Sequence, residues 1–313
     1  MIINRGFKDF KFRHRSKKNQ IIYTSKKVKD DQEILNLINN FLSEKNSFIF
    51  ESVEKGKIKG RYTIFGRNPD KIWEFNNDKS YLIKNNKKIR LKDKPKKLIE
   101  KLIESFNFKT PSNLPPISSL ISGYFSYETI KYLEKIPNSC KDDLKLPDVR
   151  LLRPRTLVIH DNLKKKIFFI INIYNDEKIK NYYKKYINIK LNLKELLFQS
   201  SLERKKITYS KTKKNIKIKS NTSKNKFINM VNRAKNYIKI GDIFQVVLSQ
   251  RFETNLIKKP IEIYKKLRVT NPSPFMYFFN FDDFQIIGAS PEILVRLRDN
   301  KITVRPIAGT RPR

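Results

Sequence analysis

The 313-residue sequence is poor in the residues that build several common kinds of functional site. It has only 8 glycines and neither a GxGxxG nor a P-loop pattern, so a glycine-rich phosphate-binding fold is not favoured. Its two histidines, His14 and His160, lie in a basic N-terminal stretch and beside a predicted turn. No His/Cys cluster has metal-ligand spacing. The sequence therefore indicates neither a Ser-His-Asp catalytic site nor a zinc site.

Cysteine and long apolar runs are also scarce. The single cysteine, Cys140, excludes an intramolecular disulfide framework and fits a reducing compartment. No stretch approaches the ~20 apolar residues of a membrane span, and the N-terminal segment lacks the apolar core of a signal peptide. We expect a soluble, cytoplasmic protein without a membrane partner.

Negative charge is in short supply, with 30 Asp and Glu against 69 Lys and Arg, a net charge of +39. Such an excess is typical of nucleic-acid or membrane-surface proteins, so a basic nucleic-acid-binding scaffold is one alternative. However, lysine runs together with Asn and Ile along the whole chain, as codons rich in A and T would produce. No zinc-finger spacing or RNA-binding aromatic motif accompanies the charge. We expect no specific nucleic-acid partner.

Apolar periodicity predicts a mixture of helices and hairpins. Spacings of three and four predict a helix capped by Asp31, a helix over 96–106, one around 227–238 that Gly241 ends, and one beginning at Pro260. Strands are predicted at 48–50, 61–65, 121–127, 151–159, 167–173, 244–252, 275–281, 284–288, 293–297 and 301–307, and around Trp73 and Phe75. Helices interspersed with hairpins indicate an α+β fold with antiparallel sheets.

Composition divides the chain into three regions. We expect an N-terminal region over 1–174, a Lys/Asn/Ile-rich connector over 175–222 with a helix near 178–186, and a C-terminal region over 223–313.

The segment 241–313 carries the residues suited to chemistry. Gln245 is a polar residue in a predicted buried strand, where it needs a hydrogen-bond partner or a ligand. Glu292 is a carboxylate beside small residues at a strand junction. Gly309 and Thr310, among arginines, could present donors to a carboxylated ligand. Each motif taken alone also has an ordinary structural explanation, such as a turn, a hairpin corner or a solvated basic end.

Taken in order, four motifs resemble a known family. GDIFQVVLSQRF (241–252), NPSPFMYF (271–278), GASPE (288–292) and PIAGTRPR (306–313) closely resemble the chorismate-utilising enzymes. That family includes anthranilate, aminodeoxychorismate, isochorismate and salicylate synthases. The resemblance covers most of residues 20–313, is weak over 175–222, and implies the family's α/β sandwich, incomplete at the C-terminus.

Two positions distinguish the branches. Isochorismate and salicylate synthases have a lysine that activates water where this chain has Gln245, and a glutamine cannot act as that base. Aminodeoxychorismate synthases typically have a nucleophilic lysine at the position of Ala308, and an alanine cannot attack. The resemblance is therefore closest to the chorismate-using subunit of anthranilate synthases, with aminodeoxychorismate synthase as the alternative.

The resemblance also implies a feedback site for L-tryptophan. In this branch a Glu-Ser pair and the NPSP segment bind the inhibitor. The matching positions are Glu51, Ser52, Asn271, Pro272, Ser273, Pro274, Phe275 and Met276. Glu51 and Ser52 alone would be read as a hydrogen-bonding pair at a strand end.

The implied reaction joins ammonia to chorismate and then eliminates pyruvate. The resemblance makes Glu292 the general acid, places Gln245 toward the nucleophile, and makes Gly309 and Thr310 chorismate contacts. It implies Mg²⁺, a glutamine amidotransferase partner and a heterotetramer. Family members continue for roughly 200 residues more, more than the minimum size of a domain, and carry their Mg²⁺ ligands and catalytic histidine there. We therefore expect residues 1–313 alone to be inactive and poorly soluble.

Overall fold

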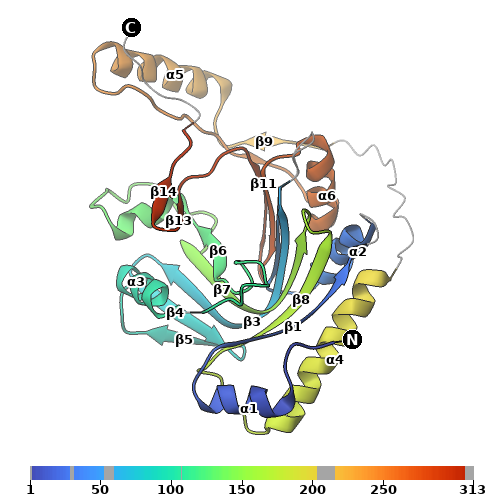
Figure 1. The fold of residues 1–313 in the computed structure, drawn as a ribbon. Coiled ribbons are helices and arrows are strands. Elements are labelled where there is room, and N and C mark those ends of the chain that lie inside the picture. Colours follow the sequence, from blue (N-terminus) through green and yellow to red (C-terminus); the bar gives the residue numbers. More distant parts are fainter. Residues whose placement is uncertain (1, 29–31, 53–59, 107, 203–215, 307–313) are drawn as a thin grey trace. The chain divides into compact units, whose positions relative to one another are not determined.

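The computed structural model describes residues 2–28, 32–52, 60–106, 108–202 and 216–306. The chain has two compact units (Figure 1). The larger, Met1–Arg204 with Pro260–Arg313, is called the sheet unit here, and Lys205–Lys259 is called the α5 unit. The domain boundaries expected near residues 174 and 222 stay a prediction.

The sheet unit is built on antiparallel strands. Its helices are α1 (Phe7–Arg15), α2 (Gln32–Phe41), α3 (Pro95–Ser105), α4 (Tyr182–Ser201) and α6 (Pro260–Thr270), with a 3-10 helix η1 (Tyr127–Tyr132). Its strands are β1 (Gln20–Lys27), β2 (Ser47–Glu51), β3 (Tyr62–Asn76), β4 (Lys79–Lys84), β5 (Lys87–Leu91), β6 (Ser122–Phe125), β7 (Val149–Asp161), β8 (Lys166–Ile173), β11 (Phe275–Asn280), β12 (Gln285–Ser290), β13 (Arg296–Arg298) and β14 (Lys301–Thr303). Within the described ranges, ten strands share one sheet. Its order is β1-β8-β7-β3-β2-β11-β12, with β4 and β5 beyond β3 and β6 beside β7.

The two faces of this sheet are covered by different parts of the chain. Alternate residues point to opposite faces, so neighbours in a strand enter different clusters. Ile49 and Val158 pack with side chains of α2, α4 and α6, whereas Phe48 and Leu157 pack on the other face with the segment 108–120. Strand β8 is buried on both faces, which explains its nearly continuous apolar sequence.

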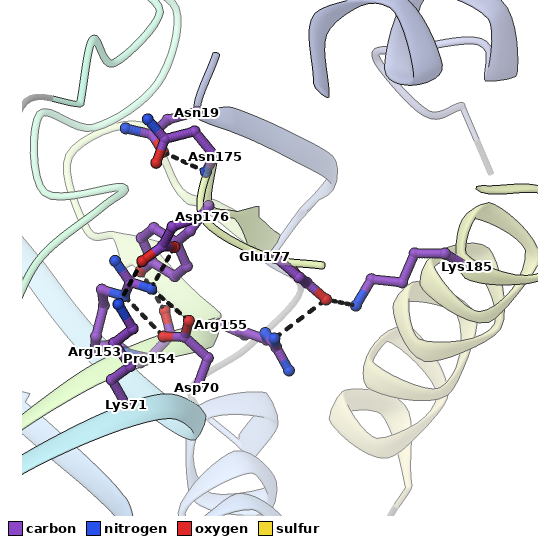
Figure 2. A network of polar contacts seen from close by, with 11 residues as sticks. Asn19, Asp70, Lys71, Arg153, Pro154, Arg155, Asn175, Asp176, Glu177 and Lys185 are labelled. Atoms are coloured by element: carbon purple, nitrogen blue, oxygen red, sulfur yellow. Dashed lines mark hydrogen bonds and ion pairs between the residues drawn. The ribbon is translucent and has the colours of Figure 1, made fainter. Parts of the chain in front are cut away.

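Charged side chains meet where the loop after β8 passes β3 and β7 (Figure 2). They are Asp70, Lys71, Arg153, Arg155, Asp176, Glu177 and Lys185. Arg153 Nη2 lies 2.5 Å from Asp70 Oδ2 and 2.8 Å from Asp176 Oδ1. Burial alone would raise the pKa of Asp176, but hydrogen bonds from Lys71 and Arg153 outweigh it and lower that pKa to about 2. Glu177 joins this loop to α4 through Lys185 Nζ, 2.5 Å away.

The structure corrects the expected break within β3. The strands expected at 61–65 and around Trp73 are one continuous strand, Tyr62–Asn76, despite the proline between them. The pairing with β7 shifts register between Pro69 and Lys71, and Asn68 has a positive φ of 54°. This β-bulge lets the strand continue past a proline that has no N–H to donate.

The expected connector also contains more structure than its composition suggested. Helix α4 runs over Tyr182–Ser201, well beyond the helix expected near 178–186. Tyr186, Ile189, Leu193 and Leu196 lie at helical spacing and are buried against the sheet. The lysines and asparagines between them concealed a regular apolar stripe.

The strand expected over 244–252 is wrong except at its last residue. The α5 unit contains β9 (Lys219–Ser220), α5 (Lys224–Lys239) and β10 (Phe252–Glu253). Strand β10 pairs only with β9. Among the residues described for this unit, 216–259, no strand lies beside 244–251, and a strand cannot form without a hydrogen-bonding partner. None of the helices described in either unit is long and apolar enough to cross a membrane.

Candidate functional site

Two segments more than 200 residues apart in the sequence lie side by side in the sheet. Strand β2 pairs with β11 so that Glu51 lies opposite Met276 and Phe50 opposite Tyr277. The Glu-Ser pair at the end of β2 therefore lies beside the start of the strand that follows the NPSP motif. This pairing brings the two parts of the predicted inhibitor site together.

A pocket of about 310 Å³ opens at this point. Its walls are mostly apolar, with a few polar groups, as is usual for small-ligand sites. It is lined by Phe50, Glu51, Ser52, Arg61, Tyr62, Pro274, Phe275, Met276 and Tyr277. Five of the eight predicted inhibitor contacts are thus pocket residues.

Two glycines allow the pocket walls to approach closely. A Cβ atom at Gly60 would lie 1.9 Å from Cβ of Ser52, so any larger residue there would displace the serine. A Cβ atom at Gly288 would lie 2.2 Å from the ring of Tyr277, which crosses over that glycine in the β11–β12 pair. At Gly60 the space admits only glycine, and at Gly288 a side chain would require the Tyr277 ring to move.

The Glu51 carboxylate is held by helix α6. Glu51 is buried, and its Oε1 accepts a hydrogen bond from the hydroxyl of Tyr264. Arg268 Nε lies 2.9 Å from Oε1 and 3.0 Å from Oε2. Burial of the phenol, followed by the negative charge of Glu51, raises the pKa of Tyr264 well above its ordinary value. Glu51 therefore joins the pocket wall to α6 in addition to lining the pocket.

Sequence reasoning missed four residues of this site. Arg61 and Tyr62 line the pocket, and Tyr264 and Arg268 hold Glu51. Arg61 donates to Asp161, with Nη2 3.2 Å from Oδ2, and its guanidinium stacks over Tyr62. Tyr62 begins β3 and Arg61 immediately precedes it, but only the antiparallel pairing of β2 with β3 places them at the pocket.

The other three predicted inhibitor contacts are not among the pocket-lining residues. The backbone N–H of Asn271 donates to the Leu267 carbonyl at 2.8 Å and closes α6. Pro272 follows, half-buried. Ser273 is buried, and its hydroxyl donates to the backbone carbonyl of Ser290, in the GASPE motif.

The predicted catalytic residues lie in different units. Glu292 follows β12 in the sheet unit, half-buried, with its backbone N–H 3.4 Å from Ser290 Oγ. Gln245 belongs to the α5 unit and is exposed in an irregular stretch after α5. Gly309 and Thr310, with Ala308, lie outside the described residues, so their chorismate contacts stay a prediction. No group of three or more His, Cys, Asp or Glu in the described ranges could hold a metal ion.

A larger cavity, of about 610 Å³, contains none of the predicted site residues. Several charged groups on its walls pair with other side chains of the chain. Arg67 Nη1 lies 2.5 Å from Glu44 Oε1, and Asp70 pairs with Arg153. The smaller apolar pocket, where the sequence motifs converge, is therefore the better candidate site.

Comparison with known proteins agrees with the motifs and the geometry. The family model described as chorismate binding enzyme matches residues 46–313. The chain belongs to this family. Strand β2, which carries Glu51, and the β11–β12 hairpin both fall within the match. The α+β fold expected from the sequence is confirmed, because the structure matches a solved member of the family.

Several similar proteins are named anthranilate synthase component 1, and two of them illustrate the match. The one from Cereibacter sphaeroides is 34% identical over 98% of this chain and 63% of its own length. The one from Acetivibrio thermocellus is 36% identical over 94% of this chain and 60% of its own length. The chain thus spans about six-tenths of the length of these relatives.

Two solved structures are similar in fold. Anthranilate synthase component I from Streptococcus pneumoniae has a TM-score of 0.66 and 29% identity, covering 81% of this chain and 55% of that one. The menaquinone-specific isochorismate synthase from Escherichia coli has a TM-score of 0.53, covering 90% of this chain and 52% of that one. Its identity is 14%, so it shows the fold alone.

Proposed function

We propose that this chain forms part of component 1 of an anthranilate synthase, which converts chorismate and ammonia to anthranilate and pyruvate and is inhibited by tryptophan. The pocket between β2 and β11 carries the proposal, because it joins the Glu-Ser pair to the segment after NPSP. The relatives named anthranilate synthase component 1 support the same branch.

Glu292 and Gln245 have distinct proposed roles. Glu292 donates a proton to the 4-hydroxyl of chorismate, which leaves as water while the C–N bond to ammonia forms. The enolpyruvyl C–O bond then breaks, and a proton transfer releases pyruvate and the aromatic ring. Gln245 faces the incoming nucleophile. Since its amide cannot remove a proton from water, it favours ammonia as the nucleophile.

Mg²⁺ is the proposed cofactor of the whole enzyme, where it would bind the substrate carboxylate and stabilise charge. The described residues do not supply a group of ligands for it. We therefore assign no step of the reaction to residues 1–313 acting through the metal.

The pocket offers suitable groups for tryptophan. Phe275 and Met276 supply apolar surface for an indole ring, and Ser52 supplies a hydroxyl. Arg61 retains donors beyond those that face Asp161, because a guanidinium has five N–H groups.

The proposed partner is a glutamine amidotransferase subunit in a heterotetramer, since ammonia from glutamine needs a second active site. The sequence contains no amidotransferase nucleophile motif. A cytoplasmic location is part of the proposal.

The activity is tested on the full-length protein that contains this chain, with chorismate, Mg²⁺ and ammonium. Blue-fluorescent anthranilate is expected, and Glu292→Gln should lower kcat by about 10²- to 10⁴-fold, the usual contribution of a general acid. The 313-residue chain alone should give no product. Aminodeoxychorismate without anthranilate would place the protein in the alternative branch.

The inhibitor pocket is tested with Ser52→Leu. The larger side chain should fill the pocket and relieve tryptophan inhibition of the full-length enzyme while activity remains. Ser105→Leu, at an exposed position of α3, is the control and should leave inhibition unchanged. Unchanged inhibition in Ser52→Leu would remove Ser52 from the site.

The nucleic-acid alternative is tested separately. Titration with DNA and RNA at increasing salt should show weak, sequence-independent binding that disappears near physiological ionic strength. Tight binding at that ionic strength would support the scaffold instead.

A further inference from the structure

The pocket wall and the catalytic segment are neighbouring strands of one hairpin. Strand β11 pairs with β12 so that Phe275 lies opposite Ser290 and Met276 opposite Ala289. Residues 274–277 line the pocket, and Glu292 follows two residues after the end of β12. A shift of the pocket wall therefore acts on the strand that leads directly into Glu292.

Ser273 extends this pairing beyond the end of the backbone ladder. Pro272 and Pro274 have no N–H to donate and restrict the backbone on both sides of the serine. The Ser273 hydroxyl donates instead to the carbonyl of Ser290. Ser273 is only 6% exposed and is not a pocket-lining residue. Its geometry is that of an internal connection and differs from that expected of an inhibitor contact.

The Ser290 side chain in turn contacts the backbone of Glu292. Its hydroxyl lies 3.1 Å from the Glu292 carbonyl oxygen and 3.4 Å from the Glu292 backbone nitrogen. A serine that bonds the backbone two residues on forms a local turn and sets the direction of the chain there. The direction of the chain at Glu292 therefore depends on Ser290, which Ser273 holds.

We propose that Ser273 and Ser290 form a hydroxyl link through which an occupant of the pocket controls the position of Glu292. This inference rests on the function proposed above and assigns Ser273 a positioning role. The occupant must favour one arrangement of the hairpin over another, since a ligand shifts an equilibrium only by its difference in affinity. A displacement of about 1 Å at a general acid is enough to lower the rate substantially.

The test uses Ser273→Ala in the full-length enzyme, with tryptophan binding measured by calorimetry and activity measured at rising tryptophan. We expect kcat to fall several-fold with KM unchanged, and the Kd for tryptophan to stay within about threefold. Activity at saturating tryptophan should be at least half of that without it. Ser273→Thr keeps the hydroxyl and should restore both kcat and inhibition.

A matched control is Ser118→Ala. Ser118 is fully buried and its hydroxyl also donates to a backbone carbonyl, that of Pro115 at 2.7 Å, but it is not a pocket residue. It should lower stability and leave inhibition intact. Ser290→Ala breaks the link at its second step and should show the same separation of binding from inhibition. It serves as the test if Ser273→Ala does not fold.

The outcomes separate the link from the proposed function. If the unaltered enzyme makes no anthranilate or binds no tryptophan, the proposed function fails. If the unaltered enzyme is inhibited and Ser273→Ala is inhibited equally, the link is wrong. Loss of tryptophan binding in Ser273→Ala would also overturn it, by making Ser273 a direct inhibitor contact.

Discussion

The sheet unit and the α5 unit have similar apolar patterns but very different burial. Helix α2 buries Leu37 and Phe41 completely, whereas in α5 Ile238, on the predicted apolar face, is 46% exposed. Over the residues described for the α5 unit, 216–259, Ala234 is the only buried side chain. Periodicity thus predicts where a helix forms, but burial requires a second surface to pack against.

This difference in burial also separates the proposed inhibitor site and Glu292 from Gln245. The proposed inhibitor pocket and Glu292 lie in a unit with an extensive core, whereas Gln245 lies in a unit whose own described residues form none. A site residue on an irregular, exposed segment is not preorganised for catalysis. We therefore expect the sheet unit to hold the pocket residues in place, whereas the α5 unit by itself does not hold Gln245 in place.

The largest expected contrast is between two phenylalanines. Phe169→Ala removes a fully buried ring from β8 and should cost about 3–5 kcal/mol of unfolding free energy. Phe244→Ala, at a position 92% exposed in the α5 unit, should change it by less than about 0.5 kcal/mol. Urea unfolding followed by the fluorescence of Trp73, the single tryptophan, reports the sheet unit. Similar effects of both changes would contradict the contrast.

Two arginines that stack on aromatic rings give the next contrast. Arg150 is buried, pairs with Glu74 and Asp283, and lies over Phe281 and Phe284. Arg150→Ala leaves the buried Glu74 carboxylate with the more exposed Lys88 as its partner and should cost about 3 kcal/mol.

Arg233 provides the matched control for this arginine. It stacks over Tyr237 on the surface of α5, so Arg233→Ala should cost less than about 1 kcal/mol. Thermal unfolding of both variants decides the comparison, and a large loss in Arg233→Ala would mean that α5 packs more tightly than its exposure indicates.

A smaller effect is expected at two tyrosine hydroxyls. Tyr264→Phe removes a donor from the buried Glu51 carboxylate and should cost about 1–2 kcal/mol, with weaker tryptophan inhibition. Tyr237→Phe removes an exposed acceptor of Arg233 and should be nearly neutral. Urea unfolding and inhibition curves are the measurements. A neutral Tyr264→Phe would show that Arg268 alone holds Glu51.

The smallest expected contrast is in how the unfolding free energy depends on pH in the acid range. The folded-state pKa of Asp176 is lowered to about 2. Its stabilising contribution is therefore complete above about pH 4, where the unfolded carboxyl is also ionised, and is lost as the pH falls toward 2. The unfolding free energies of the unaltered protein and Asp176→Asn should differ at pH 6 and converge over that window. Glu253→Gln, at an exposed pair in the α5 unit, is the control, because Trp73 lies in the sheet unit. Parallel curves for Asp176→Asn would exclude its ionisation as the cause.

Much of the sheet unit could be predicted from local pattern, because its strands and helices bury the apolar residues that define them. Strands β2, β8 and β11 and helices α2 and α3 lie where the periodicity placed them. Two of the failures have a common cause, since each depends on a partner strand. The bulge in β3 depends on pairing with β7, and the missing strand over 244–251 depends on a neighbour that the described residues do not provide.

The predicted site divides in the same way. Motif resemblance predicted Glu51, Ser52 and the residues 274–276 as inhibitor contacts, and these residues line one pocket. It could not identify Arg61 or Arg268, because their roles follow from strand pairing and helix packing. It also predicted Ser273 as an inhibitor contact, which stays a prediction; the Ser273 hydroxyl donates to the carbonyl of Ser290, and we propose a positioning role for it instead.

By itself, the sequence determined the family, the α+β class, the order of the motifs and, through Gln245 and Ala308, the branch of chorismate chemistry that we propose. These properties depend on which residues occur and how they are spaced. The tertiary structure alone decided which distant segments meet, because the register of β2 against β11 follows from packing both faces of the sheet. That register makes a pocket from two motifs and connects one of them to Glu292.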